Sequence, residues 1–72
     1  MTNKELLEKA IQASGLKKVF LASQIGLTPA GFYNCINNRA EFRVSQVHIL
    51  CDLLGITDLE EKEAIFFAEF GG

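Results

Sequence analysis

The fold of this chain is decided by residues 21–32, which read LASQIGLTPAGF. A small residue at Ala22, a glycine four positions later and an apolar residue at Phe32 are what two helices need in order to cross through a tight turn. Ala22 lets the second helix approach, and Gly26 supplies a backbone with positive φ that a residue with a Cβ resists. The spacing therefore predicts a helix-turn-helix unit whose second helix presents an outer face.

Five short helices are expected, because apolar residues recur at helical spacing throughout the chain and no stretch alternates like a strand. Pro29 suits the first position of a helix, and glycine or asparagine residues mark the expected ends. The sequence therefore predicts a single all-α domain over residues 1–72. Its helices are expected near residues 2–15, 17–25, 28–38, 45–55 and from 57 onward.

Polar residues are expected to cap four of these helices, and Thr28, directly before Pro29, is the expected N-cap of the third. Thr2 and Thr57 each stand three residues before a glutamate, which is the spacing of a capping box. Ser45 is the expected N-cap of the fourth helix. Val44 and Ile49 are placed to form a hydrophobic staple around that cap.

Length and composition exclude several classes of protein. A domain of 72 residues buries only about 60% of its unfolded surface, which leaves little room for an enclosed ligand cavity. Apolar residues make up 49% and charged residues 22%, as in globular proteins. No apolar run approaches the ~18 residues of a membrane span. The first residues lack the apolar segment of a secretory signal, so a cytoplasmic protein with no membrane partner is expected.

No constellation of catalytic or metal-ligating residues stands out in the sequence. Cys35 and Cys51 lie on apolar helix stripes and are expected to be buried thiols. His48 has no co-ligand and is expected on a helix surface. No nucleophile–base pair and no phosphate-cradling glycine loop is visible. We therefore expect no enzyme activity, no catalytic residue, no metal, no cofactor and no small-molecule substrate.

Charge is distributed unevenly, although the net charge is only −2. No acidic residue occurs from Lys9 to Ala40, and residues 14–43 carry a local charge of +3. Residues 52–72 hold six acidic residues and a single base, Lys62. The basic segment is either a surface for a polyanion or a chance cluster of a few charges.

The chain resembles the lambda-repressor/Cro class of helix-turn-helix regulators over nearly its whole length. The resemblance is carried by LASQIGLT at residues 21–28, Phe32, CINN at 35–38 and the pattern Glu41-Phe42-x-x-Ser45-x-Val47. The later segments LGIT at 54–57 and Glu63-x-Ile65-Phe66-Phe67 are similar to those of small phage regulators of Gram-positive hosts. The resemblance implies a compact five-helix domain that acts as a Cro-like regulator of a lysogeny switch. Such a regulator binds double-stranded operator DNA as a homodimer, with its third helix, here about residues 28–38, in the major groove.

Carried over position by position, and with the charge pattern added, the resemblance implies DNA contacts for one set of residues. Lys18 matches the position that holds a phosphate, and Asn34 alone near the centre of the outer face has an amide for reading base edges. Lys18 and Pro29 stand where the family often has glutamine. Gly31 is either a packing glycine or a point of close approach for DNA or a partner. The expected set is Lys17, Lys18, Thr28, Ala30, Gly31, Tyr33, Asn34, Asn37, Asn38, Arg39 and Arg43.

Aromatic residues near the C-terminus exceed what one helix face needs. The fifth helix is expected to dock one face against Leu50 and Leu54, and the remaining aromatics are expected to meet a second copy or another protein. This leaves an alternative function on the same fold, a modulator or antirepressor that binds the phage repressor protein instead of DNA. The expected partner surface consists of Phe66, Phe67, Phe70 and Phe20. For Phe20 the sequence leaves a second possibility open, that it packs under the first helix.

Overall fold

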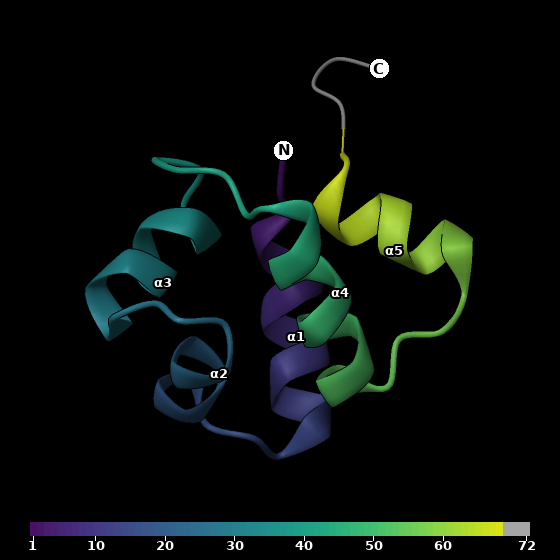
Figure 1. Ribbon diagram of the computed structural model, residues 1–72. Coiled ribbons are helices and arrows are strands. Elements are labelled where there is room, and N and C mark those ends of the chain that lie inside the picture. Colours follow the sequence, from purple (N-terminus) through teal and green to yellow (C-terminus); the bar gives the residue numbers. More distant parts are fainter. Residues whose placement is uncertain (69–72) are drawn as a thin grey trace.

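The computed structural model describes residues 1–68, which form five α-helices and no β-strand. Figure 1 shows α1 and α4 side by side in the middle of the molecule, with α2 and α3 to one side and α5 to the other. The Cα radius of gyration is 11.1 Å, and a compact domain of this length has about 11 Å. The helices are α1 (Lys4–Ser14), α2 (Lys18–Gln24), α3 (Pro29–Ile36), α4 (Val44–Leu54) and α5 (Leu59–Phe66).

All five helices contribute to one hydrophobic core. Leu7, Leu21 and Leu50 are fully buried in it. Phe42, which belongs to the loop between α3 and α4, packs edge-to-face against two further rings. Its centroid lies 5.8 Å from that of Phe32 and 5.9 Å from that of Phe66. The loop therefore joins α3 to α5 through aromatic contacts.

Three helices end in the same hydrogen-bonded turn. A left-handed residue follows each helix end within two positions, with φ of 73° at Gly26, 62° at Asn38 and 72° at Gly55. In each case the next backbone N–H donates to the carbonyl five residues earlier, over 2.8 to 2.9 Å. This is the Schellman pattern, which satisfies carbonyls that a helix end leaves without partners. Asn38 holds the left-handed position without being glycine.

The expected caps of α1 and α5 are each wrong by one residue. The N-cap of α1 is Asn3, whose side-chain Oδ1 accepts the N–H of Leu6 over 3.1 Å. Thr2 is buried and its N–H donates instead to the Asn38 side chain. The N-cap of α5 is Asp58, not Thr57, and neither threonine closes a capping box. Asparagine caps helices at least as well as threonine, which fits Asn3, whereas the side chain of Asp58 makes no capping hydrogen bond.

The expected start of α4 is wrong by two residues. Arg43 is the N-cap, so Ser45 lies inside the first turn. The N–H of Arg43 donates to Oε1 of Gln46 over 2.8 Å. Gln46, the third residue of the helix, thereby satisfies the backbone N–H of the N-cap. Val44 is 76% exposed, so the expected staple with Ile49 does not form.

Residues 1–3 tie distant parts of the chain together. The Asn38 side chain accepts the N–H of Thr2 and donates to its carbonyl, each over 2.9 Å. The N–H of Asn3 donates to the carbonyl of Ile65 over 2.6 Å, and the N–H of Ala68 donates to the carbonyl of Met1 over 2.8 Å. The first residues therefore connect the end of α3 to the end of α5.

The main neighbour of α5 is α1. The expected docking of α5 against Leu50 and Leu54 of α4 is not its main contact, although Leu50 belongs to the same core cluster as Ile65 and Phe66, and Leu54 packs against that cluster. Ile65 and Phe66 are the residues of α5 that reach the core. Within the described part of the chain, no helix combines the length and the apolar character that crossing a bilayer requires.

Candidate nucleic-acid interface

The turn between α2 and α3 holds these two helices against each other. Ala22 and Phe32 are both buried where the helices meet. The N–H of Leu27 donates to the carbonyl of Ala22 over 2.9 Å, which closes the turn. A Cβ on Gly26 would meet no atom within 4 Å, so the left-handed backbone, and not lack of space, requires glycine there.

The first turn of α3 is capped by its own sequence. Oγ1 of Thr28 accepts the N–H of Gly31 over 3.0 Å, and Pro29 occupies the first helical position. A Cβ on Gly31 would lie 3.3 Å from that same Oγ1. The nearest neighbour of Gly31 is therefore its own cap and not another helix. Ala30 is exposed beside it.

The two lysines before α2 differ in their surroundings. Nζ of Lys18 lies 2.8 Å and 2.9 Å from the two carboxylate oxygens of Glu8 on α1. Lys17 is the exposed N-cap residue of α2 and makes no side-chain capping hydrogen bond. Since Lys18 already has an anionic partner, Lys17 is the more available of the two cations.

The asparagines after α3 also have partners within the chain. Nζ of Lys4 donates to Oδ1 of Asn37 over 2.8 Å, and Nδ2 of Asn37 donates to the carbonyl of Tyr33 over 2.9 Å. Both polar atoms of the Asn38 amide bond to Thr2. These two side chains hold the end of α3 in place, a role that no local sequence pattern indicates.

Two arginines flank the loop that follows α3. The Arg39 guanidinium lies 6.0 Å from the centroid of the exposed Tyr33 ring, within cation–π range. Arg43 uses its backbone at the start of α4, while its side chain is exposed. Nε2 of Gln46 donates to the carbonyl of Ile25 over 3.2 Å, which ties the start of α4 to the end of α2.

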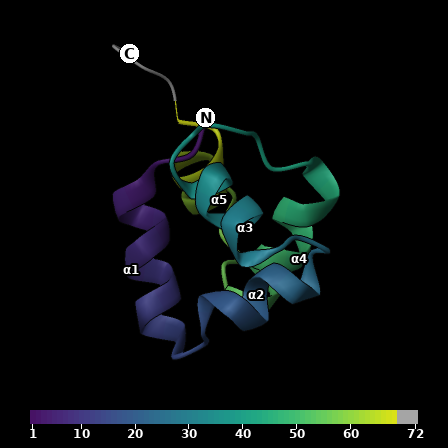
Figure 2. The ribbon, with the colours of Figure 1, turned by 90° about the vertical axis from the view of Figure 1, so that its left-hand side faces the viewer.

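The structure brings most of the expected DNA-contacting residues onto α2, α3 and the adjoining loop. These two helices lie on the side of the molecule opposite α5, with α3 foremost when that side faces the viewer (Figure 2). Asn34 is half-buried, and the exposed members of the set are Lys17, Lys18, Thr28, Ala30, Tyr33, Asn38, Arg39 and Arg43.

The expected partner surface divides into separate parts. Phe66 is only 4% exposed and packs on Phe42, so its assignment to a partner surface is wrong. Phe67 follows the last turn of α5 and is 52% exposed, and Phe20 on α2 is also exposed. Phe70 lies outside the described residues. The helix ends at Phe66, so helical periodicity no longer directs the next ring inward.

The cysteines and the histidine lie as expected. Cys35 and Cys51 are buried and His48 is exposed. Burial raises the pKa of both thiols; at Cys51, Lys62 opposes this effect, and Asp52 and nearby Glu61 add to it. In the described residues, no group of three or more His, Cys, Asp or Glu side chains is arranged to hold a metal ion.

Comparisons with known proteins identify no relative: no protein-family model, no curated protein and no solved structure matches this chain.

Proposed function

We propose that this protein is a Cro-like transcriptional regulator of the phage type, which binds operator DNA with α3 in the major groove. The observation that carries the proposal is the pairing of α2 with α3 across the Gly26 turn, with Phe32 buried between them and the outer face of α3 open. In helix-turn-helix proteins the first helix crosses the DNA backbone and the second reads base edges.

The charge around α3 supports the same function. Lys17, Arg39 and Arg43 are exposed on this side, within a segment that carries +3 over residues 14–43. They offer three phosphate contacts per protomer, because Lys18 is paired with Glu8. Each contact contributes about −0.9 to the log–log salt slope, so a homodimer would show a slope of roughly −5.

Base reading would be modest. Ala30 offers a methyl group for thymine, Tyr33 offers a hydroxyl, and Asn34 offers the amide that pairs with adenine. Because Asn34 is half-buried, sequence preference would depend largely on the shape and deformability of the duplex.

Binding to labelled duplexes, measured by fluorescence anisotropy across a range of salt concentrations, tests the proposal. Lys17→Ala should weaken binding on all sequences and reduce the salt slope by about 0.9 per protomer. Lys62→Ala, which removes a lysine from α5, is the matched control and should leave the slope unchanged. Asn34→Ala should flatten the preference among duplexes selected from a random pool. A wild type without salt-dependent binding would refute the function.

A second function, docking onto a phage repressor protein, is favoured by the partners already present within the chain. Lys18 is paired with Glu8, and the amides of Asn37 and Asn38 are engaged. The anisotropy of the cognate repressor on its operator separates the two functions. Release of the repressor by a protein that itself fails to bind the duplex would replace the first function with the second.

A further inference from the structure

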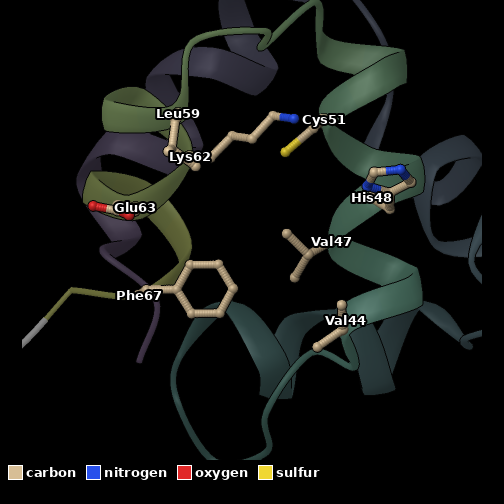
Figure 3. A pocket seen from close by; sticks show the side chains of 8 residues that line it. All are labelled: Val44, Val47, His48, Cys51, Leu59, Lys62, Glu63 and Phe67. Carbon is tan, nitrogen blue, oxygen red and sulfur yellow. The ribbon is translucent and has the colours of Figure 1, made fainter.

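An apolar groove of about 470 Å³ lies between α4 and α5, on the other side of α4 from the DNA-binding helices proposed above. Val47 and Cys51 form its buried floor. Its rim carries Val44, Leu59 and Phe67, which are 76%, 68% and 52% exposed. Figure 3 shows Val47, Cys51 and the Phe67 ring directed into the space between the two helices.

The groove exists because α5 packs mainly on α1 and leaves this side of α4 uncovered. Three large apolar side chains around one concave surface are unusual on a small monomer, where single exposed apolar residues are the rule. A groove between two helices accepts an amphipathic helix, whose apolar residues at i, i+3 or i+4, and i+7 fill it.

The charge of this part of the molecule selects among possible occupants. Residues 52–68, which end α4 and form α5, hold five acidic residues and only Lys62 as a base. Glu63 and Lys62 line the groove itself. A second copy packed face to face on a two-fold axis would bring two such acidic segments together, and like charges across an interface oppose association. The homodimer expected from the sequence would therefore need another surface.

We propose that the α4–α5 groove binds an amphipathic helix of another protein, with apolar residues on one face and lysine or arginine on its flanks. The apolar face would cover Val44, Leu59 and Phe67. The basic flanks would lie along the acidic residues of α5. This inference does not rest on DNA binding, because none of these residues belongs to the α2–α3 surface.

A selection from displayed helices tests the proposal. The library is a set of designed amphipathic helices with leucine at the apolar positions and either lysine or glutamate, in equal proportion, at every flanking position. Wild-type protein as bait should enrich clones in which lysine occupies most flanking positions. The strongest clone, made as a labelled peptide, should bind at least tenfold more tightly than its twin with glutamate at those positions, and the advantage should shrink with added salt.

Matched variants locate the binding site. Leu59→Ser should reduce peptide affinity at least tenfold. Val19→Ser, which changes a residue of α2 that is 64% exposed, should leave it unchanged. Circular dichroism establishes that both variants are folded. Neither variant should change the salt slope on DNA, so the outcomes for the groove and for DNA binding remain separate.

Three results would overturn the proposal. One is a selection that enriches no helix, or enriches lysine and glutamate equally. Another is peptide binding that survives Leu59→Ser. The third is a wild type that dimerises in sedimentation experiments and becomes monomeric on Leu59→Ser, which would assign the groove to a second copy.

Discussion

The two halves of the molecule contain the same turn but use it differently. The N–H of Leu27 bonds to the carbonyl of Ala22 after Gly26, and the N–H of Ile56 bonds to the carbonyl of Cys51 after Gly55, each over 2.9 Å. After the first turn α3 folds back onto α2, whereas after the second turn α5 moves away to α1 and leaves a groove beside α4.

The difference lies in the residue six positions after each glycine. After Gly26 that residue is Phe32, which is buried against the first helix of the pair. After Gly55 it is Glu61, which is exposed. A local stop signal therefore ends a helix, but an apolar residue on the next helix is needed to close the angle.

The largest expected effect comes from removing that apolar residue. Phe32→Ala should lower the free energy of unfolding by about 3–5 kcal/mol, because it leaves a cavity in the core. Glu61→Ala, at the equivalent position of the second pair, should change it by less than about 0.5 kcal/mol. Urea denaturation measures both. A loss below about 1.5 kcal/mol for Phe32→Ala would contradict the view that Phe32 holds α3 against α2.

Alanine substitution at Gly26 and Gly55 should show that the two turns that end α2 and α4 cost the same free energy to form with a non-glycine residue. Gly26 and Gly55 have φ of 73° and 72°, and a Cβ at either would meet nothing within 4 Å. Gly26→Ala and Gly55→Ala should each cost about 1–2 kcal/mol, from left-handed backbone alone. The same denaturation experiment compares them. Costs that differ by more than about 1 kcal/mol would show that packing, and not the backbone, distinguishes the turns.

Asn38 gives a smaller effect of mixed sign. Asn38→Gly removes the strain of a left-handed non-glycine residue but loses both hydrogen bonds to Thr2. Each such bond contributes about 0.5–1.5 kcal/mol, so the net loss should be about 1 kcal/mol. Hydrogen exchange should accelerate at the Thr2 amide. Unchanged stability together with unchanged protection of the Thr2 amide would show that the hydrogen bonds between Asn38 and Thr2 do not stabilise the fold.

The smallest effect concerns the ion pair between α1 and α2. Glu8→Gln should cost only about 0.2–1 kcal/mol of stability, because the pair is exposed to solvent. It should also release Lys18, so that affinity for duplex DNA rises and the salt slope steepens by up to about 0.9 per protomer. Glu5→Gln, on the same helix, is the control. Equal gains from both variants would mean that net charge alone matters.

The sequence predicts the helices well because their signals are local. Apolar spacing locates all five, and glycine or asparagine marks the ends at Gly26, Asn38 and Gly55. The burial of Cys35 and Cys51 also follows from their place on apolar stripes.

What the sequence does not predict depends on contacts between distant residues. Thr2 fits a capping box by pattern, but its N–H bonds to Asn38, 36 residues away. Glu8 and Lys18 pair only because α1 and α2 fold together. Phe66 and Phe67 are identical neighbours in sequence, and only the position of the helix end makes one a core residue and the other exposed.

The tie made by residues 1–3 also constrains the order in which the chain can fold. The N–H of Asn3 bonds to Ile65, and the carbonyl of Met1 accepts from Ala68. During synthesis these partners are among the last described residues to leave the ribosome. Local contacts between α2 and α3 can form early, but the α1–α5 contacts that seal the core must wait, because pairing across a long sequence separation is slow and comes late. A nascent chain that has not yet released α5 would therefore expose its apolar core to other proteins, and the core could close only after α5 has formed.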